Sequence, residues 1–239
     1  MTSAKNSLNS YKIIGIFFSY PSQEWIKNAK VLFDILKQEN AIKLPTLKNI
    51  ELFVEHIQTK EILESQEYYV RLFDRSRDIS LYLFEHVHGE SKDRGQAMLD
   101  LLDMYEQHGL ELDKKELPDY LPLFLEFLSF LPLNEAKEFL TDCVHIIAKI
   151  ATSLSQRDSI YVPLFNGLMD LAGHSSIEWK SPTKDINDWM YTMDDEWEEE
   201  QVKFLNNDHP KQTATKKCGG CSCGGEISSA DQNLSTGCV

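Results

Sequence analysis

Three cysteines lie close together near the C-terminus, in the run Cys218-Gly-Gly-Cys221-Ser-Cys223. Thiolates at this spacing on a glycine-rich backbone can wrap Zn²⁺, Cu⁺ or an iron–sulfur species, and Cys238 could supply a fourth ligand. The sequence has no second CxxC pair to complete a common zinc site. The segment is therefore interpreted either as a metal-handling site or as a redox-sensitive, dispensable extension.

Two histidines, His86 and His88, are the other pair that could bind a metal ion. Side chains two positions apart on a helix point in different directions and cannot grip one ion together. We expect one of them to hydrogen-bond or cap a neighbouring element and the other to be solvated. A response to pH is the functional alternative, because histidine titrates near neutrality.

The familiar signatures of catalysis are missing from the sequence. It contains no GxSxG elbow, no HExxH pair, no Walker loop and no dinucleotide-binding fingerprint. We therefore assign no catalytic residue and no cofactor, and we predict that the chain is not an enzyme.

Composition narrows the class of protein further. The 239 residues are 42% hydrophobic and 26% charged, which is typical of a folded globular chain. The 24 basic against 38 acidic residues give a net charge of −14, so nucleic acid is an unexpected partner. No apolar run approaches the roughly 20 residues of a membrane span, and residues 1–10 lack a signal-peptide pattern. We expect a cytoplasmic protein that does not insert into a membrane.

Apolar residues recur at helical spacing along most of the chain, and no alternating strand pattern interrupts them. The sequence thus predicts an all-α bundle of about nine to ten helices. Ser22 is the expected N-cap of the second helix, and Gly109 the expected end of the sixth. The expected helices cover about 8–20, 22 through 36, 45 through 57, 61–73, 80–87, 91–109, 120–131, 134–154 and 157–172.

Two of these segments have distinctive patterns. Asp119 is the expected N-cap of 120–131, which is apolar almost all round and is therefore placed in the middle of the bundle. The segment 91–109 has the clearest amphipathic pattern. Its expected core residues are Met98, Leu101, Leu102 and Tyr105.

The composition changes after Gly173. The expected domain covers residues 1–205, with a compact core at about 8–173 and a peripheral acidic helix at about 194–205. Beyond it, 206–239 is expected to be a flexible, Cys- and Gly-rich tail, because it has almost no large apolar residue. The acidic helix is interpreted as solvated, and the alternative is an arm that covers a binding groove with Trp197 and Phe204.

Several stretches of sequence together resemble the NarJ-type nitrate reductase assembly chaperones. The resemblance is close over 68–132, looser over about 11–205, and does not extend to the tail. It rests on Leu72-Phe-Asp-Arg75, Leu83-Phe-Glu-His-Val-His-Gly-Glu-Ser91, Asp93-Arg-Gly-Gln-Ala-Met98, Tyr105-Glu-Gln-His-Gly-Leu110 and Glu116-Leu-Pro-Asp-Tyr-Leu-Pro122, with Trp197-Glu-Glu-Glu-Gln-Val-Lys-Phe204 also similar.

The resemblance implies the helical fold of the wider TorD-like chaperone superfamily. It also implies that the chain binds the N-terminal peptide of the catalytic alpha subunit of respiratory nitrate reductase. Such a chaperone holds that subunit competent for molybdenum cofactor insertion, releases it to its membrane partner and is absent from the mature enzyme. Proteins that deliver the cofactor are further expected partners. The residues expected to bind the client peptide are Phe84, His86, His88, Arg94, Tyr105, Glu116, Asp119, Tyr120 and Phe124.

The chain departs from the superfamily's short signature at one position. An acidic residue, a spacer and Asp-His fall here on Glu116, Asp119 and Tyr120, so that tyrosine replaces histidine. Tyrosine cannot become cationic near neutral pH, and a titrating role is not expected of it. His86, His88 and His108 remain the candidates for pH sensitivity.

Overall fold

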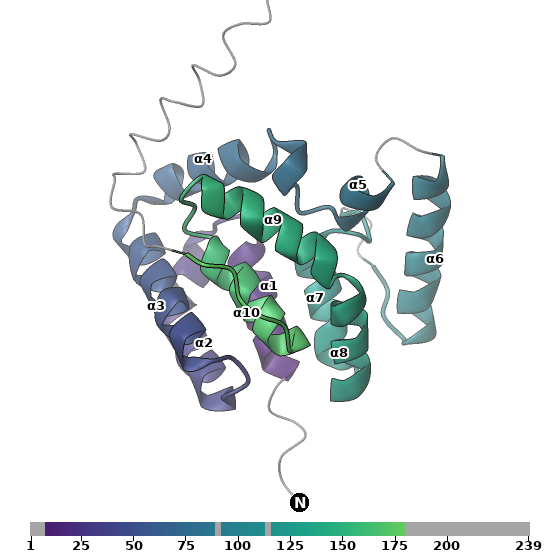
Figure 1. The fold of residues 1–239 in the computed structure, drawn as a ribbon, viewed down its shortest axis with the longest axis horizontal. Helices are drawn as coiled ribbons and strands as arrows, with labels where there is room; N and C mark the ends of the chain where they lie inside the picture. The colour runs from purple at the N-terminus through teal and green to yellow at the C-terminus, as the bar shows by residue number, and fades with distance from the viewer. Residues whose placement is uncertain (1–7, 89–91, 113–115, 180–239) are drawn as a thin grey trace, which may run out of the picture. The chain divides into compact units, whose positions relative to one another are not determined.

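The structure is a computed structural model that describes residues 8–88, 92–112 and 116–179. Within these ranges the chain forms ten α-helices and one 3₁₀ turn and has no β-strand, which confirms the all-α class (Figure 1). The expected acidic helix at 194–205, the tail and its four cysteines lie outside the described residues. The helices are α1 (Leu8–Phe18), α2 (Gln23–Glu39), α3 (Leu44–Thr59), α4 (Ile62–Phe73), α5 (Leu83–Val87), α6 (Asp93–Gln107), α7 (Leu121–Phe130), α8 (Leu133–Asp142), α9 (Val144–Gln156) and α10 (Val162–Ala172), with the 3₁₀ turn at Arg77–Ile79.

Helix ends follow local chemistry where the sequence signal is strong. The Ser22 hydroxyl accepts a hydrogen bond from the Trp25 backbone N–H, which confirms the predicted N-cap of α2. Gly109 has a φ of +76°, a left-handed conformation that glycine adopts without strain, directly after α6. The predicted end of the 91–109 helix is therefore also confirmed.

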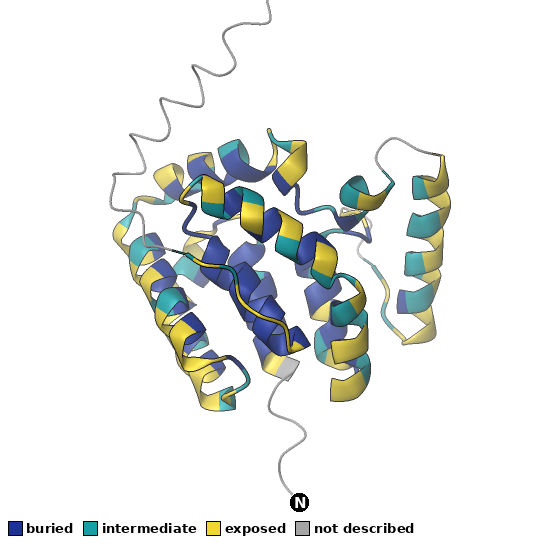
Figure 2. Cartoon of the chain, viewed as in Figure 1, coloured by how far each residue is buried: buried dark blue, intermediate teal, exposed yellow. Residues whose placement is uncertain are grey.

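The centre of the bundle is α10 and not α7. All eleven residues of α10 are buried, and Figure 2 shows this helix dark blue along its length, beside α1. In α7, by contrast, Phe130 is 58% exposed and Leu123 is half-buried. The prediction that 120–131 lies in the middle was wrong in this respect: α7 packs against α1 on one side and keeps apolar residues at the surface on another.

A glycine sets how closely α1 and α7 approach. A Cβ added at Gly15 would lie 3.1 Å from the Pro122 carbonyl oxygen and 3.3 Å from the Leu125 Cβ. A side chain at this position would require Pro122 or Leu125 to shift by a few tenths of an ångström, so glycine permits the close approach of the two backbones. This contact is the most extensive between any two of the described elements.

Two predicted helices differ from the structure. The expected 134–154 helix is two helices, α8 and α9, with a break at Cys143, whose carbonyl accepts hydrogen bonds from both Ile146 and Ile147. No proline or glycine marks the break, and the apolar pattern continues across it. The sequence therefore gives no signal that the helix ends there. The expected amphipathic 91–109 helix begins at Asp93, and Tyr105 is its only buried residue. Its other expected core positions are half-buried, because this helix lies at the edge of the described bundle (Figures 1 and 2).

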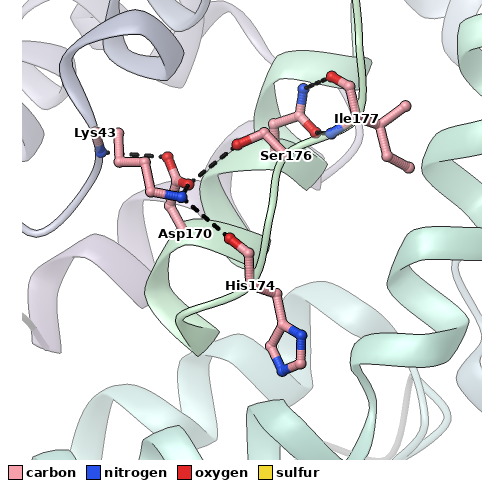
Figure 3. Close-up of polar contacts among 6 residues, drawn as sticks. Lys43, Asp170, His174, Ser176 and Ile177 are labelled. Atoms are coloured by element: carbon pink, nitrogen blue, oxygen red, sulfur yellow. Dashed lines mark hydrogen bonds and ion pairs between the residues drawn. The ribbon is translucent and has the colours of Figure 1, made fainter.

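The described body continues beyond the expected core boundary at residue 173. The side chain of Asp170, on α10, accepts hydrogen bonds from the Lys43 backbone N–H at 3.2 Å and from the Ser176 hydroxyl at 3.1 Å, and the Lys43 ammonium lies 2.6 Å away (Figure 3). One turn earlier, the Asn166 amide pairs with both backbone groups of Ile177 at 2.8 and 2.9 Å. A buried carboxylate and a buried amide thus hold 174–177 against α10.

Trp179, the last described residue, also contacts this body. Its indole N–H donates to the Ser159 carbonyl at 2.9 Å, and its side chain packs on the core. Contacts with the described helices thus continue past residue 173 as far as residue 179, within the expected 1–205 domain. None of the described helices is long and apolar enough to cross a bilayer.

Candidate functional site

Two segments that are far apart in the sequence meet in a short antiparallel bridge between Tyr82 and Tyr120. The Leu83 N–H donates to the Asp119 carbonyl at 3.0 Å, and the Leu121 N–H donates to the Leu81 carbonyl at 2.8 Å. Both segments are extended just before a helix begins, so each can use its free backbone groups to pair with the other. This junction brings together most of the residues that the sequence singles out.

Asp119 lies at the junction and is fully buried. Its carboxylate accepts a hydrogen bond from the Phe84 backbone N–H at 3.1 Å, in the first turn of α5. The prediction that Asp119 caps its own helix was wrong: Tyr120 is the N-cap of α7 and makes no side-chain cap bond. The carboxylate instead satisfies an orphan donor of a helix that precedes it by 35 residues in the sequence.

Burial dominates the electrostatics of this carboxyl. Removal from water raises the pKa of Asp119 above its ordinary value of 3.8, although the Phe84 N–H and the Arg94 guanidinium oppose the shift. Within the part of the chain that the structure describes, Asp119 Oδ1 has no hydrogen-bond partner. The ionised carboxylate is thus only partly compensated.

Arg94 connects α6 to the junction. Its Nη2 lies 3.4 Å from Glu85 Oε1 on α5 and 4.0 Å from Asp119 Oδ2. The arginine therefore bridges two carboxylates from separate segments, as expected for a planar donor with several N–H groups.

Tyr120 belongs to a cluster of tyrosines. Its hydroxyl is 2.9 Å from the Tyr69 hydroxyl, which donates in turn to the Phe18 carbonyl at 2.8 Å. The Tyr82 ring lies 5.4 Å from the Tyr120 ring. Burial raises the pKa of Tyr120 to about 12, so the side chain stays neutral and acts through hydrogen bonding and packing.

Tyr105 and Phe124 lie in the core behind the junction. The Tyr105 hydroxyl donates to the Pro118 carbonyl at 2.7 Å, and its ring lies 4.6 Å from Phe127. Phe124 also faces Phe127, at 6.4 Å. Both residues are almost fully buried, at 2% and 4% exposure, so little of either side chain is accessible in this structure.

The histidines have different surroundings. His86 Nε2 is 2.9 Å from the Ser80 carbonyl, which fits the expectation that one of the pair makes a hydrogen bond. His88 is half-buried and lies edge-on to the Phe84 ring at 5.6 Å. His108 lies elsewhere, between α6 and α8, 2.8 Å from the Met104 carbonyl and 3.0 Å from Glu135. Hydrogen bonds to two acceptors raise the pKa of His108 above 6.5. The Met104 carbonyl has the larger effect and the Glu135 carboxylate the smaller one.

The remaining candidate, Glu116, lines a furrow between α1 and α7, together with Tyr120. The volume of this furrow is about 210 Å³. Sequence analysis did not identify the α1 side of this furrow, which consists of Lys12, Gly15, Ile16 and Ser19. Their spacing of three and four residues is a signal that could have found them, because it places all four on one helix face. Among the described residues, no group of three or more His, Cys, Asp or Glu side chains could hold a metal ion.

The fold and the site define an all-helical protein whose signature residues tie three helices, α5, α6 and α7, to one junction. Comparison with known families agrees with this description. The chain belongs to the nitrate reductase delta subunit family, whose model matches residues 39–166. That match spans the whole junction.

Individual relatives are similar over most of the chain. It is 40% identical over 211 residues to the nitrate reductase molybdenum cofactor assembly chaperone NarJ of Escherichia coli K12, covering 87% of this chain and 86% of the relative. It is 42% identical over 201 residues to the probable chaperone of the same description, NarW, from that strain, covering 82% and 84%. A crystal structure of a putative redox enzyme maturation protein from Archaeoglobus fulgidus is 25% identical, with a TM-score of 0.48, over 70% of this chain and 93% of that one.

Proposed function

We propose that this protein is an assembly chaperone of a respiratory nitrate reductase. In this proposal it binds the N-terminal peptide of the catalytic alpha subunit, keeps that subunit competent for molybdenum cofactor insertion, and releases it for docking at the membrane. The chaperone is not retained in the mature enzyme. The observation that carries the proposal is the 40% identity over 87% of the chain to a relative that is named as such a chaperone.

The exposure of the signature residues supports a binding role, because some of them are accessible at the surface and others are buried. Glu116 is exposed, and Phe84 and His88 are half-buried, so these side chains are available to a client. Asp119 is buried behind them and fixes the start of α5. We assign client contact to the first group and positioning to the second.

Apolar contact can supply part of the affinity that such a chaperone needs. Burying about 400 Å² of apolar surface at about 25 cal/mol per Å² gives on the order of 10 kcal/mol before association and ordering costs are subtracted. Micromolar to nanomolar binding requires on the order of 8–12 kcal/mol net, so polar and charged contacts with the client must add to this apolar contribution. The net charge of −14 favours a client peptide that carries lysine or arginine beside its apolar residues.

Co-purification tests the proposal. The affinity-tagged full chain is isolated from nitrate-respiring cells that lack the native copy, and the bound proteins are identified by mass spectrometry. We expect the catalytic subunit, without its membrane partner, and we expect nitrate reductase activity to depend on the chain. Normal enzyme maturation in the deletion strain, together with no recovery of the catalytic subunit, would refute the proposal.

A further inference from the structure

A shallow furrow runs between α1 and α7, where the two helices are held close together by Gly15. Its base consists of the Gly15 and Pro122 backbones and of two half-buried apolar side chains, Ile16 and Leu123. Its volume of about 210 Å³ is smaller than the roughly 300 Å³ at which small-molecule pockets begin. The furrow can therefore take apolar side chains of a docked chain but is too small for a bulky cofactor.

Two carboxylates and one ammonium line the rim of this furrow. The Lys12 ammonium on α1 lies 3.1 Å from Glu126 Oε1 on α7 and 5.6 Å from the centre of the Phe130 ring. Lys12 and Glu126 are about half exposed, at 47% and 48% of their side-chain surface, and Phe130 is 58% exposed. Glu116, also on the rim, is exposed.

The position of the Lys12 ammonium indicates that this rim favours cationic groups. A carboxylate beside an exposed aromatic face attracts a cation through both charge and the ring quadrupole, and here the protein's own Lys12 occupies that position. An exposed pair of this kind contributes little to stability, typically below about 1 kcal/mol. An incoming cation can therefore displace the Lys12 ammonium at small cost.

From this geometry we propose that the α1–α7 furrow is a docking surface for the client peptide. One apolar side chain of the peptide inserts over Ile16 and Leu123, and a neighbouring lysine or arginine of the peptide pairs with Glu126 and Glu116. Lys12 competes with that basic residue for Glu126. This inference rests on the proposed function, because it names the surface and the charge pattern by which the same client is recognised.

The charge pattern gives opposite predictions for two kinds of variant. Reversing both carboxylates in Glu116→Lys/Glu126→Lys replaces attraction by repulsion, so the Kd rises at least about tenfold at low salt. Replacing the competing cation in Lys12→Gln frees Glu126 and lowers the Kd about threefold. A merely structural role for Lys12 would not tighten binding. Glu138→Lys/Asp142→Lys, an exposed double reversal on α8, is the matched control for net charge.

Fluorescence anisotropy measures these differences with the full-length protein. The probe is a labelled synthetic peptide with the N-terminal sequence of the nitrate reductase catalytic subunit from the same organism, in about 50 mM salt, where screening is weak. A second peptide carries glutamine in place of its lysines and arginines, and all the variants should bind this peptide equally. Thermal unfolding of each variant checks that it is folded.

The outcomes separate this inference from the proposed function. Three results together support the furrow when the wild type binds: the carboxylate double variant binds more weakly, Lys12→Gln binds more tightly, and the Glu138→Lys/Asp142→Lys control is unchanged. Wild-type binding with equal effects of the double variant and the control, or with weaker binding by Lys12→Gln, overturns the furrow and leaves the proposed function standing. No binding of the peptide by the wild type contradicts both.

Discussion

Replacing Asp119 tests whether its carboxylate fixes the junction between α5 and α7. Asp119→Ala leaves the Phe84 N–H without its acceptor, which should destabilise the fold by about 1–2 kcal/mol, the usual contribution of such a cap. In a chain of this size about 1 kcal/mol lowers the melting temperature by about 2–4 °C. Asp119→Asn keeps an oxygen acceptor in the same place, so it should retain the hydrogen bond.

The pH dependence of the asparagine variant follows from the pKa of the native carboxyl. Because burial raises that pKa above 3.8 in the folded protein, the folded state holds the proton more tightly than the unfolded state. The contribution of Asp119 to stability is then present below pH 3.8 and is lost as the pH rises through the raised pKa. Asp119→Asn cannot ionise, so its free energy of unfolding should rise relative to wild type between about pH 4 and neutrality.

Urea unfolding at a series of pH values measures this difference directly. Asp103→Asn, which removes an exposed carboxylate from α6, is the control for the change in charge. We expect the difference between Asp119→Asn and wild type to grow with pH while the control difference stays flat. A difference that falls as the pH rises would show that the ionised carboxylate stabilises the junction, and would refute the reasoning.

Three further substitutions have expected outcomes that thermal or urea unfolding can check. Gly15→Ala should destabilise the fold by about 1–2 kcal/mol despite alanine's better helix propensity, because its Cβ would lie 3.1 Å from the Pro122 carbonyl oxygen. An unchanged midpoint of unfolding would show that α1 can move away from α7. Tyr69→Phe should lower the free energy of unfolding by about 1 kcal/mol, because the buried Phe18 carbonyl loses its hydrogen-bond donor. An unchanged stability would mean that a water molecule replaces the tyrosine hydroxyl. His108→Gln should destabilise the fold by about 0.5 kcal/mol more near pH 6 than near pH 9, because the raised pKa makes the ion pair between His108 and Glu135 available only at the lower pH. Equal losses of stability at both pH values would exclude a contribution from the charge.

Local signals in the sequence were sufficient for most of the helices. Ser22 and Gly109 could be assigned because a cap and a left-handed residue depend only on their immediate neighbours. The break at Cys143 could not, because α8 and α9 each have an apolar face and the pattern continues through the residue that separates them. Burial of α10 as the central helix likewise depends on which helices surround it.

The site was harder to predict because its contacts are long-range. The sequence indicated that Asp119 accepts a hydrogen bond, but not that the donor is Phe84, which only the pairing of the two segments brings near. Asn166 and Asp170 are polar residues one turn apart in an apolar helix, and this anomaly could have predicted the docked segment that follows. The sequence could not indicate a role for Lys12, because its ion-pair partner, Glu126, is 114 residues away.

The central claim is that this chain recognises the N-terminus of a nitrate reductase catalytic subunit. Isothermal titration calorimetry of the full chain with that synthetic peptide tests it most directly. We predict a single site with a Kd between about 1 nM and 1 μM and a negative heat-capacity change from apolar burial. Absence of heat at several temperatures, together with no competition by the unlabelled peptide at about 50 μM, would contradict it.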